Sequence, residues 1–388
     1  MDFQLDEEFR LLNETVNKFV ENELMPLEAL VLEREALGGS HELTDAELAP
    51  LHDKCRELGL WGLDCPAETG GADLPAIALV GVNEALGRTI TPFTFPPDSP
   101  NLHMLLATAN DQQKEKYLEP YARGETISAI AISEPGAGAD PAGMSTRAVR
   151  DGDDWVLNGR KIWISRMDKS DFTIVMAVTD PEKGSRGGIS AFLVDRDTPG
   201  LEIARKILLI GGHYNYEIVF DNCRLPASQL LGVEGQGFAP MQWRLIVRRL
   251  EMGAWCLGTA RRALDMLCDY ANQRETFGER LADRQSIQWW VADLETRCHC
   301  LQLMLWHAAT KQDDGGDVRT EASMIKLYGT ELATDAIDWA MQTYGAMGMT
   351  KELPLHLMAQ RVRLMRIYEG PSEIHRWVLA RQRLKQNA

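Results

Sequence analysis

The chain has 388 residues, of which 45% are hydrophobic and 25% charged, and its formal net charge is −16. This length exceeds one ordinary hydrophobic core, so we expect a globular protein of two or three domains. The acidic balance argues against nucleic acid as a partner, because phosphate binding needs a basic surface.

The N-terminus and the cysteines bear on location. Residues 1–8 are acidic and lack the basic and apolar regions of a signal peptide. No apolar run approaches the roughly 20 residues that cross a bilayer. Seven cysteines without a C-x-x-C pair indicate reduced thiols. We therefore expect a cytoplasmic protein with no membrane insertion.

Residues 1–125 have a helical pattern and form the first expected domain. Apolar side chains recur at helical spacing from Phe9 to Val20, and residues 77–86 predict another helix. The segment 92–100 contains four prolines, which predicts an irregular crossing segment.

Residues 126–235 change to a β pattern. Apolar runs bounded by turn residues predict strands at 127–132, 172–178, 189–194 and 217–220. The Asn158-Gly159 dipeptide, which lies between two further apolar runs, is typical of a two-residue hairpin turn. We expect a small β-domain.

Long helices return over residues 236–388. Apolar stripes run from Leu257 to Ala271 and from Met324 to Ala340, which predicts a helical bundle. Cys298-His299-Cys300 falls in a helical pattern, where adjacent side chains point about 100° apart, so we expect packing there and no metal site. The predicted fold is mostly α with a central β-domain.

Three segments are candidates for chemistry. Glu369 stands on a turn before Gly370, Pro371 and a final helix, where a rigidly held carboxylate is poised to act as a general base. The loop 133–141 contains G-x-G but lacks the third glycine of a dinucleotide fingerprint; its backbone N–H groups can still meet a phosphate or a flavin edge. The pentad 274–278 combines an arginine, a hydroxyl and an aromatic ring, which suits a diphosphate and a flat ring. Each segment alone is also explained as an ordinary turn or cap.

Taken in this order, the segments resemble the acyl-CoA dehydrogenase family over essentially the whole chain. Four stretches are similar to motifs of that family: S-E-P-G-A-G-A-D at 133–140, R-E-T-F-G at 274–278, Q-T-Y-G-A-M-G at 342–348 and Y-E-G-P-S-E at 368–373. The resemblance implies an N-terminal helical domain, a middle β-barrel or sandwich and a C-terminal four-helix bundle. It also implies FAD as cofactor, an acyl-CoA as substrate, an electron-transferring flavoprotein as electron acceptor, and a homo-oligomer arranged as a dimer of dimers.

The resemblance assigns roles to single positions. Glu369 would be the catalytic base. Substrate contacts are implied for Ala139, Arg249 and Gly370. FAD contacts are implied for Ile132, Ser133, Gly138, Trp163, Ser165, Pro371 and Glu373. A neighbouring subunit would complete the FAD site with Arg274, Phe277, Gln285, Gln342, Gly345 and Ala346.

The implied reaction is α,β-dehydrogenation of a thioester to the trans-2-enoyl-CoA, in fatty-acid β-oxidation. Glu369 would remove the α-proton while the β-hydrogen leaves as hydride to flavin N5. Its main-chain N–H and a flavin hydroxyl would stabilise the incipient enolate. Some family members place the base on the helix before R-x-x-F-G; here that position is Arg248, which cannot accept a proton.

The chain departs from the family pattern in several places. Ala139 replaces a serine, Ala346 a glycine and Pro371 a threonine, and Gln360-Arg361 replaces the usual Arg-Asp. Short stretches at 284–290 and 212–217 are similar to the subgroup that contains human family members ten and eleven.

Three other readings stay open. They are a flavin monooxygenase or oxidase on the same fold, an inactive subunit of a hetero-oligomer, and a DNA-binding flavoprotein of the adaptive-response type, which the acidic charge disfavours. Substrate identity is also open, because Met252, Trp289 and Trp290 are explained equally by an acyl pocket and by packing between helices.

Overall fold

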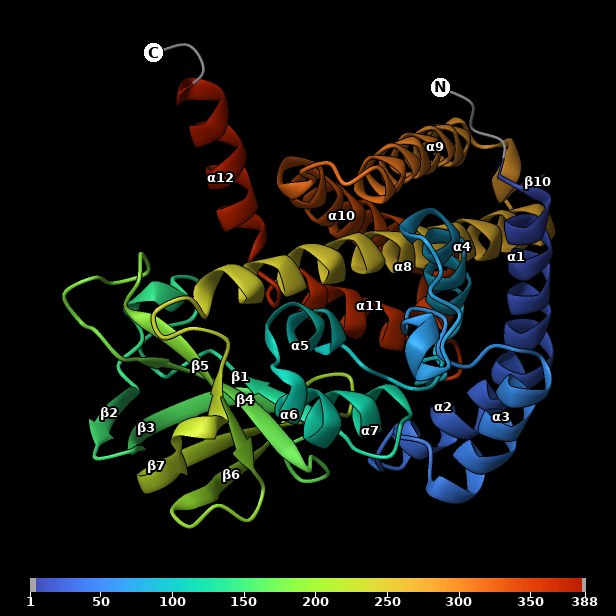
Figure 1. The fold of residues 1–388 in the computed structure, drawn as a ribbon. Coiled ribbons are helices and arrows are strands. Elements are labelled where there is room, and N and C mark those ends of the chain that lie inside the picture. Colours follow the sequence, from blue (N-terminus) through green and yellow to red (C-terminus); the bar gives the residue numbers. More distant parts are fainter. Residues whose placement is uncertain (1–4, 386–388) are drawn as a thin grey trace.

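The computed structural model describes residues 5–385 and consists of two helical regions and a sheet (Figure 1). The first region has a core around Val16, Phe19, Leu51 and Phe93. Its helices are α1 (Glu7–Phe19), α2 (Glu28–Ala36), α3 (Asp45–Glu57), α4 (Ala76–Gly87), α5 (Leu102–Thr108), α6 (Asp111–Gln113) and α7 (Glu119–Ala122). Residues 92–100, the predicted irregular segment, contain neither helix nor strand, because none of the four prolines has a backbone N–H to donate inside an element.

The middle region is an eight-stranded sheet in the order β6-β7-β3-β2-β4-β5-β8, with β1 pairing in parallel to β4. Its strands are β1 (Ser128–Ala131), β2 (Arg147–Asp151), β3 (Asp154–Ser165), β4 (Phe172–Val178), β5 (Ile189–Asp195), β6 (Leu201–Leu208), β7 (Tyr214–Pro226) and β8 (Leu230–Leu231). Alternate residues of β4 enter two cores. Ile174 packs with the helical residues Tyr117 and Tyr121, and Val175 packs with Trp155 inside the sheet. This double burial explains why β4 is a continuous apolar run.

The predicted hairpin at Asn158-Gly159 is wrong. β3 runs unbroken through both residues, and the tight turn lies earlier, where Asp151 pairs with Asp154. Between Leu157 and Gly159 the pairing of β3 with β7 shifts register, so the glycine marks a bulge instead of a turn.

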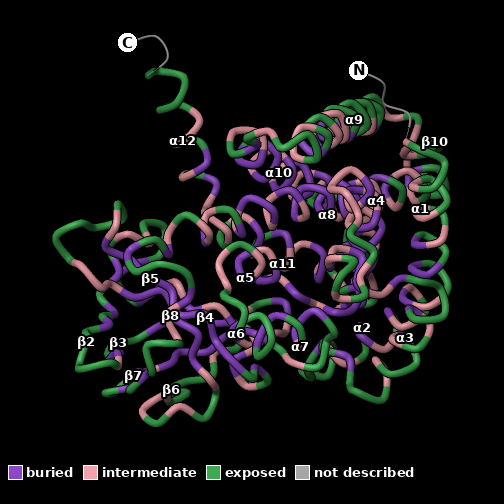
Figure 2. The backbone as a smooth tube through the Cα atoms, viewed as in Figure 1, coloured by how far each residue is buried: buried purple, intermediate pink, exposed green. Residues whose placement is uncertain are grey.

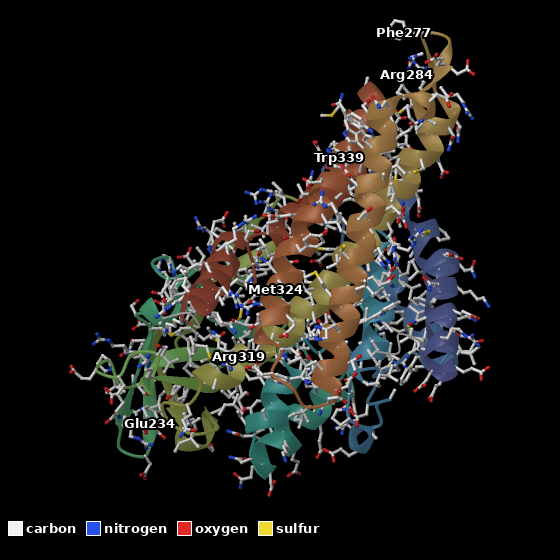
Figure 3. The ribbon with its side chains drawn as sticks, turned by 90° about the horizontal axis from the view of Figure 1, so that it is seen from above. Glu234, Phe277, Arg284, Arg319, Met324 and Trp339 are labelled. Carbon is white, nitrogen blue, oxygen red and sulfur yellow. The ribbon has the colours of Figure 1, made fainter. Side chains whose placement is uncertain are left out.

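The last region contains α8 (Phe238–Gln273), α9 (Gln285–Asp313), α10 (Arg319–Tyr344) and α11 (Leu355–Met365), with the short strands β9 (Glu275–Thr276) and β10 (Glu279–Arg280) between α8 and α9. Their apolar stripes share one core. α8 and α10 approach closely because Gly253 has no side chain; a Cβ there would lie 2.1 Å from Cγ2 of Ile325. Met324 lies on the outer surface instead of in the predicted stripe (Figure 3).

The 36 residues of α8 span about 54 Å. Figure 1 shows the helix crossing from the sheet to the far end beside α1. The final helix, α12 (Ser372–Lys385), projects from the body, and most of it is exposed or half-buried (Figure 2). Among residues 5–385, no helix combines the length and apolar composition that crossing a bilayer requires.

Candidate active site

Glu369 sits on a strained turn between α11 and α12. Its φ is 55° and that of Gly370 is 92°, and a non-glycine residue in this left-handed region costs on the order of 1 kcal/mol or more. Two cations, the half-buried Arg249 and the buried Lys326, hold the turn: Nε of Arg249 donates to the Glu369 carbonyl at 2.9 Å, and Nζ of Lys326 donates to the Gly370 carbonyl. Glycine is required at 370, because a Cβ there would combine strain with a 3.2 Å approach to the His375 ring.

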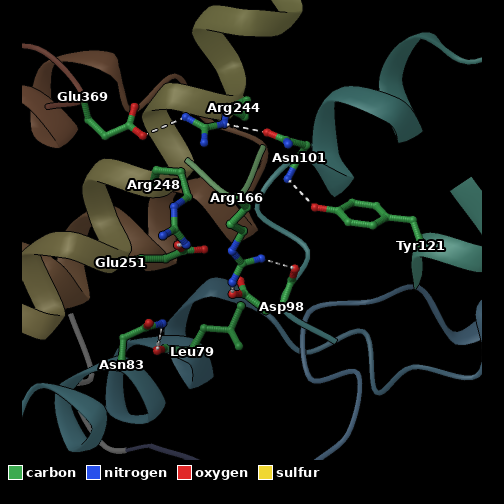
Figure 4. Close-up of polar contacts among 10 residues, drawn as sticks. All are labelled: Leu79, Asn83, Asp98, Asn101, Tyr121, Arg166, Arg244, Arg248, Glu251 and Glu369. Atoms are coloured by element: carbon green, nitrogen blue, oxygen red, sulfur yellow. Dashed lines mark hydrogen bonds and ion pairs between the residues drawn. The ribbon is translucent and has the colours of Figure 1, made fainter. Parts of the chain in front are cut away.

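The carboxylate of Glu369 pairs with Arg244 of α8. Nη1 of Arg244 lies 2.7 Å from Oε1 of Glu369, and the two side chains are only 9% and 13% exposed. Figure 4 shows that the guanidinium lies between Glu369 and Asn101. The paired position makes Glu369 a carboxylate aimed into the interior, and not a solvated turn residue.

A buried hydrogen-bond chain continues from Arg244 into the first helical region. Nε of Arg244 donates to Oδ1 of Asn101 at 3.1 Å, and Nδ2 of Asn101 donates to the Ser128 hydroxyl at 2.8 Å. The main-chain N–H of Asn101 donates to the Tyr121 hydroxyl at 3.1 Å (Figure 4). With three partners for Asn101, Arg244 is anchored at Nε while its Nη1 bonds Glu369.

Two further arginine pairs lie beside this one in Figure 4: Arg166 with Asp98, and Arg248 with Glu251. The Glu251 carboxylate raises the pKa of Arg248 above its usual value, so the position that carries a glutamate in some family members is here a permanent cation. Burial, and next the Glu251 charge, raise the pKa of the nearby Asp64 to about 6. The surroundings of Glu369 are therefore rich in arginine.

The loop at 133–141 is organised by a buried ion pair. Lys161 of β3 lies 2.9 Å from Glu134 and donates to the Ile132 carbonyl at 2.9 Å. Glu134 also accepts hydrogen bonds from Ser145 and from the Thr146 amide. Burial opposes ionisation of Glu134, but these donors and the ammonium hold its pKa down, at about 2.

The outer side of this loop is open. A Cβ at Gly138 would meet no atom within 4 Å, so a ligand can approach the backbone there. Ser133 and Ala139 flank the same stretch, and the Ser133 carbonyl accepts from the Ile162 amide at 3.0 Å. The loop is thereby fixed against β3, whose end carries the next candidate residues.

Trp163 and Ser165 at the end of β3 fit a flat ring. Trp163 has φ 65° and its large side chain is 52% exposed. Nδ2 of Asn215 donates to the Trp163 carbonyl at 3.0 Å and to the Ser165 hydroxyl oxygen at 2.9 Å. Because the Ser165 oxygen accepts from Asn215, its O–H is free to donate outward. An exposed aromatic face beside a free hydroxyl donor fits an isoalloxazine ring.

The remaining candidates lie at the other end of α8. Arg274 follows Arg244 by 30 positions on or next to the helix, a separation of about 45 Å. Tyr344 of α10 stacks on Tyr270 with ring centroids 4.2 Å apart, so Gln342, Gly345 and Ala346 lie near Arg274. Phe277, on the β9–β10 hairpin, is 100% exposed, and Figure 3 shows it at the tip with Arg284 of the stretch just before Gln285. The predicted cofactor-binding residues therefore form two groups, one around Glu369 and one around Arg274, at opposite ends of α8.

The structure also places residues whose role was open. Trp290 stacks on Trp339 at 5.7 Å in the bundle, Trp289 points to solvent, and Met252 is buried in the bundle core. Pro371 precedes α12, and the buried Ser372 hydroxyl has no hydrogen-bond partner among residues 5–385. Glu373 is exposed in the first turn of α12.

Sequence reasoning missed the residues that hold the site. They are Asn101, Lys161, Asn215, Arg244 and Lys326. Lys161, Arg244 and Lys326 had a signal, since each is a charged residue next to apolar residues. The others join the site through contacts between elements far apart in the chain.

Comparison with known proteins decides the family. Three family models match, described as acyl-CoA dehydrogenase N-terminal domain at residues 6–125, middle domain at 129–223 and C-terminal domain at 235–384. The chain belongs to the acyl-CoA dehydrogenase family. It is 41% identical to (R)-benzylsuccinyl-CoA dehydrogenase of Thauera aromatica, covering 99% of this chain and 97% of that protein.

Other relatives show the breadth of the family. Acryloyl-CoA reductase (NADH) of Anaerotignum propionicum is 32% identical over 100% of this chain and 97% of its own length. The solved butyryl-CoA dehydrogenase of Megasphaera elsdenii superposes with a TM-score of 0.87 and 29% identity, covering 99% of this chain and 100% of that one.

Membership makes this acyl-CoA dehydrogenase family protein an oxidoreductase that acts on a CH–CH group of an acyl-CoA, with FAD as cofactor. The predicted fold is confirmed: a helical domain, a β-sheet domain and a second helical domain. The narrower likeness to human members ten and eleven finds no support in these relatives, and their names do not single out fatty-acid β-oxidation.

Proposed function

We propose that the protein dehydrogenates an acyl-CoA thioester between its α- and β-carbons, with Glu369 as the α-proton base. One observation carries the proposal: the only carboxylate on the 366–373 turn that is aimed inward is Glu369, held in a strained conformation by Arg249 and Lys326. Strain that the surrounding structure maintains is typical of functional positions.

The residues around Glu369 have separate roles in the proposed reaction. Glu369 accepts the α-proton on a carboxylate oxygen, after Arg244 has moved off Oε1. The Tyr368 amide bonds back to Leu364 at 3.1 Å; the next amide, that of Glu369, is the donor that we assign to the thioester oxygen. Bound FAD supplies the acceptor for the β-hydride. Ser165, oriented by Asn215, would donate its O–H to the cofactor, and the exposed face of Trp163 would pack against it.

The 133–141 loop and its neighbours form the cofactor side of the site. Ile132, Ser133 and Gly138 present backbone next to the open space, with Pro371 and Glu373 at the start of α12. Ala139, Arg249 and Gly370 lie on the substrate side. Pro371 removes one polar contact to the cofactor, and Ala139 removes one to the cofactor or to CoA, so we expect weaker binding of these groups and an unchanged reaction.

We infer a homo-oligomer in which Arg274, Phe277, Gln285, Gln342, Gly345 and Ala346 complete the FAD site of a neighbouring subunit. The separation of about 45 Å along α8 and the full exposure of Phe277 support it. The apolar side of α12 also lacks cover, since Trp377 and Leu384 are exposed. An electron-transferring flavoprotein as electron acceptor and a cytoplasmic location complete the proposal.

An anaerobic titration with acyl-CoAs tests the function by following the flavin absorbance. Short, branched, aromatic and dicarboxylic acyl groups belong in the panel, and Glu369→Gln is the matched control because it keeps size and removes basicity. We expect one class to bleach the wild-type flavin and none to bleach the variant. A yellow protein that no thioester bleaches would instead support an oxygen-reacting flavoprotein.

The reverse direction is a second candidate, because a reductase is 32% identical over the whole chain. To test the reverse reaction, chemically reduced protein is mixed with the enoyl-CoA product, and reoxidation of the flavin is followed by its absorbance. Reoxidation by the enoyl-CoA that is much faster than bleaching by the acyl-CoA would favour a reductase.

A further inference from the structure

We propose that the acyl group carries a second, free carboxylate, and that Arg244 is the residue that binds it. The substrate class is thus the CoA monothioester of a dicarboxylic acid. This inference rests on the proposed function, since it takes the α-carbon to lie beside Glu369.

The charges around the base motivate the assignment. Arg166 and Arg248 have carboxylate partners of their own, Asp98 and Glu251. Arg244, by contrast, is paired with the base itself at 2.7 Å. Arg249 and Lys326 donate to main-chain carbonyls, at Glu369 and Gly370.

Catalysis removes the partner of Arg244. A carboxylate that takes a proton becomes neutral, and Glu369 is the ion-pair partner of this guanidinium in the described chain. A side chain that is 9% exposed would then carry an uncompensated buried charge, which is strongly unfavourable. A neutral acyl group offers nothing to replace the lost pair. A carboxylate on the substrate restores it, and the exchange frees Glu369 to act as a base.

The geometry limits where that carboxylate stands. A reacting α-carbon lies about 3–3.5 Å from the base oxygen, and Nη1 of Arg244 is 2.7 Å from the same oxygen. The guanidinium that leaves Glu369 therefore starts roughly 6 Å from the α-carbon. A carboxylate attached at the β- or γ-carbon, or on a short branch at the α-carbon, reaches it.

The anchoring of Arg244 favours binding over a merely structural role. Nε is held by Asn101 at 3.1 Å, and Asn101 is itself fixed by Ser128 and Tyr121. Nη1 faces Glu369, and a planar guanidinium can match a carboxylate with two parallel hydrogen bonds. The Arg166–Asp98 pair lies in the same region (Figure 4).

The test compares two substrates that differ in one charge. Glutaryl-CoA and a branched succinyl-CoA, each beside the methyl ester of its free carboxyl group, are oxidised by the FAD-loaded enzyme with an artificial electron acceptor. Charge pairs of this kind discriminate by roughly 30-fold or more, so we expect kcat/KM for the acid to exceed that for the ester by at least that factor. Arg244→Gln should abolish the preference, and Arg244→Lys should keep part of it.

The ratio of acid to ester separates this role from others. If Arg244 only affects the basicity or position of Glu369, Arg244→Gln lowers kcat/KM for the acid and the ester by the same factor. The ratio then stays constant, which refutes the proposal. Equal oxidation of acid and ester by the wild type refutes it without any variant. If neither substrate nor any neutral thioester is oxidised, the proposed function fails. Arg88→Gln, which removes an arginine paired with Asp265 on the outside of α4, is the control and should leave the ratio unchanged.

Discussion

The buried pair of Lys161 and Glu134 offers a sharp test of how the sheet prepares the cofactor loop. The two side chains are 0% and 3% exposed and 2.9 Å apart. Lys161→Met leaves a buried carboxylate without its counter-charge, which typically costs about 3–5 kcal/mol. Because Ser145 and Thr146 still donate to Glu134, we expect about 3 kcal/mol, the lower end of that range.

Urea unfolding followed by tryptophan fluorescence measures this loss, since Trp155 and Trp163 both lie on β3. The variant should also retain less FAD, because Lys161 holds the Ile132 carbonyl. Glu134 has a lower pKa in the folded chain than in the unfolded one, about 2 against 4.5. The contribution of ionised Glu134 to the free energy of unfolding is therefore present above pH 4.5 and lost as the pH falls toward 2. This loss of stability should be smaller in Lys161→Met.

Two controls make the result decisive. Lys183→Met removes an exposed lysine paired with Asp180 and should cost no more than about 0.5 kcal/mol. The double variant Lys161→Met/Glu134→Gln leaves no buried charge and should recover part of the stability. A single variant that costs no more than the surface control would refute our account of the loop.

Three further predictions concern the rest of the site. Ser165→Ala should slow flavin reduction, measured by stopped flow, by roughly 10-fold, because it removes one hydrogen bond of about 1–1.5 kcal/mol. Ser165→Thr keeps the hydroxyl and should reduce the flavin at the wild-type rate. Equal rates for the wild type and both variants would exclude a donor role for Ser165. Phe277→Ala should lower FAD content without changing the thermal stability of the apoprotein, because this side chain is fully exposed in one chain; unchanged FAD content would argue against a shared site. Burial, with Arg249 and Lys326 nearby, lowers the pKa of His375 to about 3, so stability should fall as the pH drops below 6.5, where only the unfolded chain takes up the proton. His375→Gln should show a shallower fall between pH 6.5 and 4, and identical pH profiles would contradict the buried neutral histidine.

Local pattern was enough to predict several elements. The apolar run at 172–178 and the helical spacing at 77–86 predicted β4 and α4, because burial on two faces or one stripe leaves a direct mark on residue order. It failed at Asn158-Gly159, where a bulge between β3 and β7 uses the same glycine that a hairpin would use. Local pattern also failed at Met324, because helical spacing identifies the apolar face of a helix but not whether another element packs against that face.

The sequence by itself determined the family, the candidate base and the cofactor, since these depend on short motifs whose residues are adjacent in the chain. Only the tertiary structure decided how Glu369 is held and what faces it. Arg244, Arg249 and Lys326 come from α8 and α10, more than 40 positions away from the turn that they contact. Packing of the helices sets those distances, and packing depends on side chains throughout the bundle. For the same physical reason the charge that we assign to the substrate was invisible in the sequence, because it follows from which arginine is paired with the base itself.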